Sequence, residues 1–176
     1  HVDEKEATIE IRSEITNDAT EKATLEVIHQ IYDPQGKLQQ TLKQQLSVKA
    51  GETQTVRKTS AIGRPQLWSP ESPRLYEIVT TLRNPKTGME LDRSTHKTGF
   101  RWFSFDGEKG FSLNGKPYKL RGVNRHQDQA PVGVALDDEA HRRDIRLIKE
   151  MGCNFIRIAH YPQDDALVEA CDEMGL

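Results

Sequence analysis

The sequence predicts a chain of two structural classes: an immunoglobulin-like β-sandwich followed by a segment in which short strands alternate with helices. Apolar residues recur with period two from residue 8 to residue 102, the pattern of half-buried strands. From about residue 104 this alternation gives way to apolar positions three apart, bounded by helix caps. The length of 176 residues is too short for a closed eight-stranded α/β barrel, which needs about 250 residues.

The predicted sandwich occupies residues 1–103. Its alternation is clearest at Ile9, Ile11 and Ile15, which are separated by polar residues. Asn, Pro and Gly interrupt the alternation where chain reversals require them, at residues 16–18, 33–36, 50–52 and 84–88. About seven short strands at this spacing, with no helical period between them, favour an immunoglobulin-like sandwich.

The second part, residues 104–176, begins with a predicted hairpin that has turns at 106–107 and 114–115. A strand over 119–124 follows, and then a helix whose first turn holds the acidic residues of 137–139. Ile145, Ile148 and Met151 lie three apart on this helix, and Gly152 follows as a left-handed terminating residue.

A second strand over 154–158 and a second helix, capped by Asp164 or Asp165 and running to Met174, complete the pattern. The order predicts a βαβα arrangement with a parallel pair of strands and right-handed crossovers.

Composition excludes several classes of partner. Lys and Arg total 25 against 27 Asp and Glu, a formal net charge of −2, so the chain lacks the basic surface of a nucleic-acid-binding protein. No apolar run reaches the 18 or more residues of a membrane span, so we predict no membrane partner. The first ten residues lack the basic and apolar regions of a secretion signal, so we expect mature sequence or an excised piece, and the compartment is open.

The two cysteines, Cys153 and Cys171, are too few for a disulfide framework and lack metal-ligand spacing. We expect reduced packing residues, with a disulfide as the alternative because the topology places both near one end of the fold.

Candidate functional residues follow the two predicted strands, because loops at the carboxyl ends of parallel strands open onto one shared face. Asn124, His126 and Asp128 belong to the first cluster, and His160 belongs to the second. Each cluster holds a histidine with another hydrogen-bonding side chain within two residues, a composition suited to hydroxyl-rich ligands. A single loop histidine is usually a local hydrogen-bonding residue, but two on one rim favour a functional site.

Arg157 lies inside the second predicted strand between Ile156 and Ile158, so its side chain points opposite to theirs. Inside a barrel such an arginine needs a carboxylate partner, and no strand of this chain offers one at an inward position. The alternative is an arginine on the helix-facing side, paired with a neighbouring acid. A zinc site of His126, His160 and Asp128 lacks a fixed local motif, so we predict no metal site.

Three segments carry a resemblance to a known family: residues 110–126 (GFSLNGKPYKLRGVNRH), 152–162 (GCNFIRIAHYP) and 171–175 (CDEMG). In this order they closely resemble family 2 glycoside hydrolases, especially the β-galactosidase branch. That family places a sugar-binding jelly roll first, then an immunoglobulin-like sandwich, then a catalytic (β/α)₈ barrel. The chain is similar to the sandwich plus the first two βα units, which implies an incomplete (β/α)₈ barrel over residues 104–176.

The resemblance also implies roles for the candidate residues. His126 and His160 match histidines of the glycone subsite, Asp128 matches an acid that binds sugar hydroxyls in some relatives, and Asn124 lies beside them. Arg157 matches the arginine that hydrogen-bonds the nucleophilic carboxylate. The implied substrate of the parent protein is a terminal β-galactoside, with β-glucuronidase or another family 2 activity as the alternative.

Two departures from the family pattern bear on that substrate. Ala159 replaces the small polar residue that usually precedes His-Tyr-Pro, and Gln127 stands where glucuronidase-like members often carry Glu. The catalytic carboxylates of the family lie on strands four and seven, past Leu176, so the resemblance implies that this chain has no catalytic residue of its own and is inactive alone. We expect no cofactor in this chain, although a divalent cation could serve the full-length enzyme.

Two further expectations concern partners. Strands left unpaired in an incomplete barrel would allow a homo-oligomer to form through their open edges. A different class of function is a stand-alone carbohydrate-binding or spacer module that uses the sandwich alone. An aromatic stripe on one sandwich face would favour it, and residues 1–99 contain only Tyr32, Trp68 and Tyr76, at scattered positions.

Overall fold

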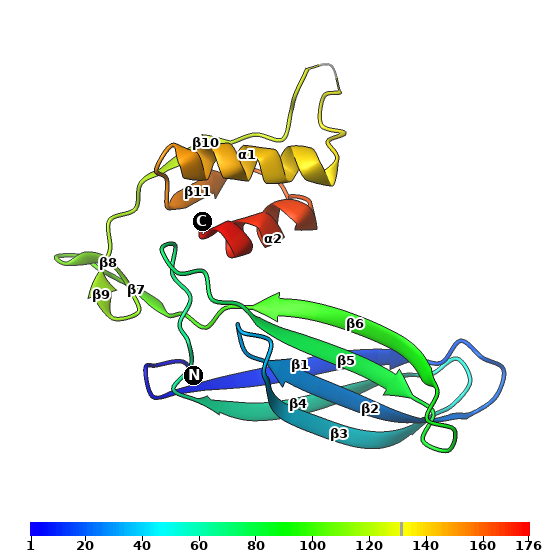
Figure 1. Cartoon of the computed structure of the whole chain (residues 1–176). Coiled ribbons are helices and arrows are strands. Elements are labelled where there is room, and N and C mark those ends of the chain that lie inside the picture. Colours follow the sequence, from blue (N-terminus) through cyan, green and yellow to red (C-terminus); the bar gives the residue numbers. More distant parts are fainter. Residues whose placement is uncertain (131) are drawn as a thin grey trace. The chain divides into compact units, whose positions relative to one another are not determined.

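The computed structural model describes residues 1–130 and 132–176 and divides the chain into two compact units (Figure 1). The first unit comprises residues 1–66 and 76–98, and the second comprises residues 67–75 and 99–176. The sequence indicated a single division at residue 103. Segment 67–75, which leaves the first unit and returns to it, was not anticipated.

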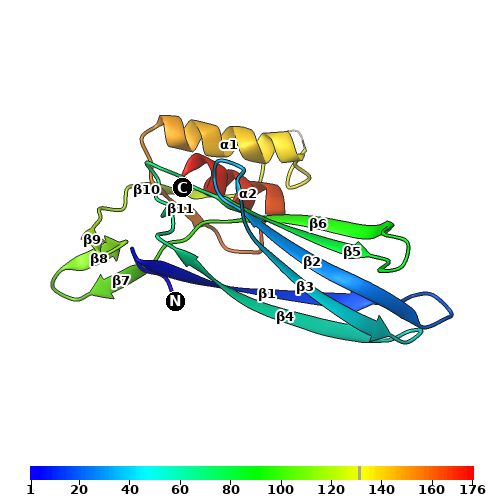
Figure 2. The same cartoon turned by 60° about the horizontal axis from the view of Figure 1, so that its bottom comes forward.

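The first unit is an antiparallel β-structure built from long strands (Figure 2). A sheet of order β3-β2-β5-β6 accompanies the antiparallel pair β1-β4. Residues 1–98, all of which are described, contain six strands instead of about seven, because most strands run 9 to 11 residues without a break. The strands are β1 (Glu6–Thr16), β2 (Ala23–Tyr32), β3 (Leu38–Val48), β4 (Thr53–Gly63), β5 (Tyr76–Arg83) and β6 (Glu90–Thr98).

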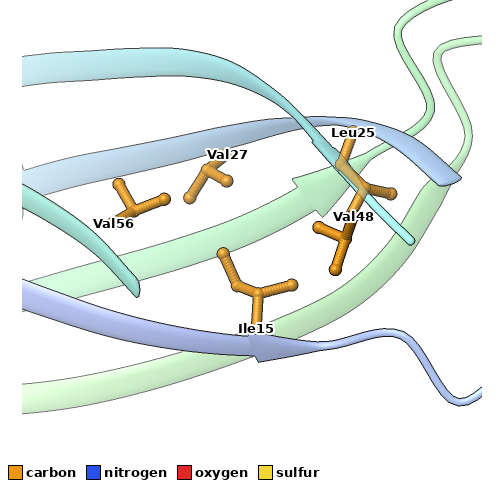
Figure 3. Close-up of a cluster of buried hydrophobic side chains, with 5 residues drawn as sticks. All are labelled: Ile15, Leu25, Val27, Val48 and Val56. Atoms are coloured by element: carbon orange, nitrogen blue, oxygen red, sulfur yellow. The ribbon is translucent and has the colours of Figure 1, made fainter. Parts of the chain in front are cut away.

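The core of the first unit lies between its strands and consists of the inward positions of the period-two pattern. Figure 3 shows Ile15, Leu25, Val27, Val48 and Val56 converging from β1, β2, β3 and β4. Burying each such side chain contributes about 1.5 to 3 kcal/mol of transfer free energy. The predicted sandwich is therefore confirmed, with its hydrophobic face where the alternation placed it.

The second unit contains the predicted βαβα arrangement. A three-stranded antiparallel meander precedes it, formed by β7 (Phe103–Asp106), β8 (Gly110–Leu113) and β9 (Lys116–Pro117). Then follow β10 (Gly122–Arg125), α1 (Asp138–Glu150), β11 (Phe155–Ile158) and α2 (Asp165–Met174), with β10 and β11 parallel. The start of an α/β barrel is thus observed, although the first strand ends at Arg125 and not at Asn124 as expected.

Helix caps explain the boundaries of α1 and α2. The Asp137 carboxylate accepts a hydrogen bond from the Ala140 amide at 2.8 Å, and Asp164 accepts one from the Ala166 amide at 2.9 Å. Gly152, with φ +84°, has the left-handed conformation that was predicted after the first helix. Met151, expected on the apolar face, is instead 70% exposed, because the helix ends before it and it becomes the C-cap residue.

Both helices pack against one face of the β10-β11 pair. Their buried contact joins Ile145 and Ile148 of α1 to Leu167, Ala170 and Cys171 of α2, and Val123 and Ile156 of the two strands pack against it. Cys153 and Cys171 are free thiols, as expected for packing residues.

Segment 67–75 is held to the rest of the second unit by polar contacts at the ends of the helices. The buried Trp68 ring donates from Nε1 to the carbonyl oxygen of Asp172 at 2.8 Å. Lys149 Nζ donates to the carbonyl oxygens of Pro70 and Gly175 at 2.8 and 2.7 Å. The C-terminal end of α2 therefore has partners for two otherwise free carbonyl groups, those of Asp172 and Gly175.

Candidate functional site

The register of β10 and β11 decides which side chains share a face. Asn124 is paired with Arg157, so these two residues lie opposite each other on the same side of the parallel pair. Both are exposed, whereas their neighbours Val123 and Ile156 pack against the helices. Arg157 therefore points away from the helices, and the helix-facing alternative does not apply to it.

Arg157 has no acidic partner in the described part of the chain. Its Nη2 atom lies 3.2 Å from Nδ1 of His160, and because a guanidinium can only donate, Nδ1 accepts. This contact leaves most of the guanidinium donors free for a ligand or another part of a larger protein.

The two candidate histidines are brought together. The ring centroids of His126 and His160 lie 5.6 Å apart with the ring planes nearly perpendicular, at 83°. Tyr161 completes the cluster, because its ring centroid lies 6.2 Å from that of His126 and its hydroxyl accepts a hydrogen bond from the Gln127 amide at 2.8 Å. Two loops separated by a whole helix thus meet at the carboxyl ends of the strands.

Asp128 does not belong to this cluster of aromatic rings. Its side chain is exposed in the loop after β10, and it forms no hydrogen bond or ion pair within residues 1–130 and 132–176. In that same part of the chain no three His, Cys, Asp or Glu side chains are grouped as a metal site requires, so the zinc alternative gains no support.

The sequence reasoning missed a second layer behind the rim, centred on Arg125. This side chain is 6% exposed, points to the helix side and forms an ion pair with Asp144, in which Nη2 lies 2.8 Å from Oδ2. A signal was available: Arg125 alternates with Asn124, and Asp144 belongs to the helix face that also carries His141, Ile145 and Ile148. Arg125 is therefore a strand arginine with a carboxylate partner inside this chain, and the carboxylate partner expected for Arg157 stays a prediction.

The rim candidates offer several hydrogen-bonding groups and one carboxyl group. Imidazole, amide and guanidinium groups at one rim suit a ligand with many hydroxyl groups. Glycoside hydrolysis with retention needs two carboxyl groups about 5 to 5.5 Å apart, and the only acid among the rim candidates is Asp128.

Two other features lie outside the rim. A cavity of about 380 Å³ in the second unit is lined mainly by apolar side chains, including Phe103, Phe155 and Ile158, and by none of the rim candidates. In the sandwich, Tyr76 is buried and Tyr32 half-buried, and Trp68, which belongs to the second unit, is buried too. These three residues therefore offer no aromatic platform for sugar.

A parallel βα start with polar side chains at the carboxyl ends of its strands is typical of enzymes with an α/β barrel. Residues 1–101 match the family described as Glycosyl hydrolases family 2, and residues 106–176 match the TIM barrel domain of the same family. The chain belongs to glycosyl hydrolase family 2, which confirms the resemblance seen in its motifs.

Solved structures and curated relatives agree with this assignment. The chain is 61% identical to a β-glucuronidase of Bacteroides uniformis, with a TM-score of 0.97 over 100% of this chain and 21% of that one. It is 34% identical to a β-galactosidase of Bacteroides ovatus over 99% of this chain and 20% of the relative. A β-glucuronidase of Bacteroides fragilis is 43% identical over 65% of this chain and 16% of its own length.

The chain thus spans about a fifth of the length of the relatives that match nearly all of it. No helix in the described part of the chain is long and apolar enough to cross a membrane.

Proposed function

We propose that a full-length protein containing this chain hydrolyses β-glycosides with retention of configuration, and that this chain supplies part of its sugar-binding rim. Membership of glycosyl hydrolase family 2 supports the reaction class. The 61% identical relative is also known in a form covalently bound to cyclophellitol-6-carboxylate aziridine. A covalent adduct of that kind fits a mechanism with a glycosyl-enzyme intermediate.

Two glycones are candidates, and the relatives include enzymes named for each. The sequence motifs put β-galactosides first. The 61% identity to a β-glucuronidase over the whole chain, against 34% to a β-galactosidase, favours β-glucuronides as the first substrate to test. β-Galactosides are the alternative, and Gln127, at a position where glucuronidase-like members often carry Glu, is the feature that counts against β-glucuronides.

The observation that carries the proposal is the position of Arg157. Its guanidinium is exposed on the strand face shared with Asn124, contacts His160 and has no acidic partner among the described residues. In the proposed enzyme Arg157 hydrogen-bonds the nucleophilic carboxylate and keeps it ionised. Asn124, His126, Asp128 and His160 bind the sugar hydroxyls.

The experiment compares the 176-residue chain with the full-length protein on nitrophenyl β-glucuronide and nitrophenyl β-galactoside. The chain should show no turnover, because positioning groups without the acid/base and the nucleophile cannot form the intermediate. The full-length protein should turn over one of the two substrates with a clear preference. Turnover by the isolated chain that is abolished in His160→Ala would contradict the assignment of the catalytic carboxylates to other segments.

Arg157→Ala in the full-length protein should lower kcat more than it raises KM, since the lost interaction belongs to the nucleophile. Arg142→Ala is the matched control, because it removes an arginine of α1 that pairs with Glu169 and Glu173 and does not contact the rim. A raised KM with unchanged kcat in Arg157→Ala would mean that Arg157 binds substrate only.

A divalent cation for the full-length enzyme is a further proposal, and a calcium-binding mutant of the Bacteroides uniformis β-glucuronidase supports it. The residues described here hold no group of three ligands that fits such an ion, so no step of the proposed mechanism uses one. Dialysis of the full-length protein against a chelator, followed by calcium addition, tests whether activity depends on the ion.

A further inference from the structure

Exposed and less exposed residues alternate along the loop that follows β10. His126 lies between Arg125 and Gln127, and Asp128 lies between Gln127 and Gln129. These flanking residues are buried or half-buried, whereas His126 and Asp128 are exposed. In the second loop, His160 follows the buried Ala159. The exposed side chains therefore belong to backbone segments whose neighbouring residues are buried or half-buried.

Arg125 forms several of the hydrogen bonds that fix these backbone segments. Its Nε and Nη2 atoms donate to Asp144 Oδ2 at 3.1 and 2.8 Å, and Nη1 donates to Gln163 Oε1 at 3.0 Å. Nη2 also lies 3.3 Å from Nδ1 of the fully buried His141, which must accept because Arg125 can only donate. One guanidinium thus joins its own strand to α1 and to the loop after β11.

Other contacts close the network around the same residues. Gln129, from the loop after β10, donates from Nε2 to Asp144 Oδ1 at 3.1 Å. The Gln127 amide donates to the Tyr161 hydroxyl, and the Ala159 amide donates to the carbonyl oxygen of Arg125 at 3.3 Å. Both loops are consequently tied to Asp144 or Arg125 by direct hydrogen bonds.

We propose that Arg125 is a positioning residue, which sets the separation and orientation of the loops that carry His126 and His160. Its bond to Gln163 fixes the second loop, and its ion pair with Asp144, shared with Gln129, fixes the first. The positioning stands on the geometry of this chain alone. Its effect on catalysis rests on the proposed glycosidase function.

The planar fork of arginine explains the choice of residue. The hydrogen bonds of Arg125 run to three different acceptors, Asp144 Oδ2, Gln163 Oε1 and His141 Nδ1. A lysine at this position would place a single ammonium group against Asp144 without also reaching Gln163. The apolar contact between α1 and α2 does not include Arg125, so the rim network and the core are separate sets of interactions.

The first experiment measures the rim by NMR in the 176-residue chain. Two variants are compared, Arg125→Met and Gln163→Leu, with Arg142→Met as the matched control on α1. Nuclear Overhauser effects between the His126 and His160 rings measure whether the two rim loops stay in contact. Methyl resonances of Ile145, Ile148 and Leu167 show whether the packing of the core changes.

In Gln163→Leu, which leaves the Arg125–Asp144 ion pair intact, we expect the contact between the histidine rings to be lost while the core methyl resonances stay unchanged. In Arg125→Met, the proton of the His141 imidazole should redistribute between its two nitrogens, which nitrogen-15 shifts detect. The control should change neither. Histidine rings that keep their contact in Gln163→Leu overturn the proposal, and so do rim and core changes that occur together, since they indicate a purely structural role.

The second experiment measures kinetics in the full-length protein. Gln163→Leu and Arg125→Lys should lower kcat by about tenfold or more, because displacements near 1 Å in an active site cost up to about a hundredfold. KM should change less than kcat. Arg125→Lys should retain more activity than Arg125→Met. If the wild-type protein hydrolyses no glycoside, the proposed function fails while the NMR result still decides the role of Arg125.

Discussion

Gly175 lies directly against the backbone carbonyl of Pro70, with no room for a Cβ atom between them. Gly175 is also the C-cap of α2 and has φ +80°, a conformation that costs other residues about 1 to 2 kcal/mol. The end of the helix and segment 67–75 therefore meet at a position that only glycine can occupy.

Gly175→Ala should accordingly destabilise the second unit by about 2 to 5 kcal/mol, the sum of backbone strain and overpacking. Gly152→Ala is the matched control, since Gly152 has φ +84° at the end of α1 but no atom near the position of a Cβ. It should cost only about 1 to 2 kcal/mol. Urea unfolding followed by tryptophan fluorescence measures both changes, because Trp68 and Trp102, the only two tryptophans, belong to the second unit.

Equal losses in the two alanine variants would show that the contact with Pro70 relaxes at no cost. Segment 67–75 would then be only loosely held to the helices.

The stability of the first unit should fall in mild acid because of His29. This histidine is fully buried on β2, with Nδ1 3.0 Å from Thr80 Oγ1 and Nε2 without a partner in the described part of the chain. Burial, and secondarily the charge of Lys58, lower the pKa of His29 below its ordinary value of 6.5. The unfolded chain therefore binds the proton more readily than the folded chain.

It follows that the stability contributed by a neutral His29 is fully present above pH 6.5 and is lost as the pH falls below 6.5 toward the lowered folded pKa. His29→Gln keeps a hydrogen-bonding group beside Thr80 and cannot titrate, so the slope of its unfolding free energy between pH 7 and 5 should be flatter than that of the wild type. Parallel slopes in circular dichroism melts would exclude His29 as a source of acid sensitivity.

The two cysteines should differ in reactivity. Burial, with a smaller effect of the Asp172 charge, raises the pKa of Cys171 to about 11, so at pH 8 only about one thiol in a thousand is ionised there. Cys153 is half-buried. A thiol reagent should modify one cysteine readily in the native chain and the second only in denaturant. Cys153→Ser identifies the slow thiol, and fast native labelling of that variant would contradict the packing of Cys171 against α1.

The parts of this structure that the sequence predicts are those governed by local chemistry. The carboxylates of Asp137 and Asp164 predict the starts of the two helices, because a capping side chain bonds a backbone amide only two or three residues away. The opposite faces of Arg157 and Ile156 follow from strand geometry. The meeting of His126 with His160 also follows, since parallel strands bring their carboxyl ends together.

The parts that escape prediction depend on contacts between residues far apart in sequence. Trp68 donates to a carbonyl group 104 residues away, and no local pattern marks either partner. Arg125 was placed in a loop because the strand was expected to end at Asn124. Only its pairing with Ile158 extends the strand by one residue and turns the guanidinium toward Asp144.

The last prediction concerns the open edges of the parallel pair. Within the described chain, β10 and β11 pair only with each other, and each contributes four residues, whereas the strands of the first unit run 8 to 11 residues. Phe103 and Phe105 are 62% and 73% exposed, and Phe155 and Ile158 of β11 are also exposed. Unpaired edges beside exposed apolar surface favour association.

We therefore expect amides from residue 120 onward to exchange with solvent much faster than those of residues 8–98 in dilute solution, and to gain protection as the concentration rises. Ile158→Lys places a charge on the β11 edge and should weaken that concentration dependence, because charged residues block edge pairing. Lys43→Glu, on β3 of the first unit, is a control that should leave it unchanged. Hydrogen exchange across a dilution series, with the molar mass measured by light scattering, tests the prediction. Uniform and concentration-independent protection in a monomer would mean that the two helices and the 67–75 segment stabilise the strand pair without any further strand, and the account of its open edges would be wrong.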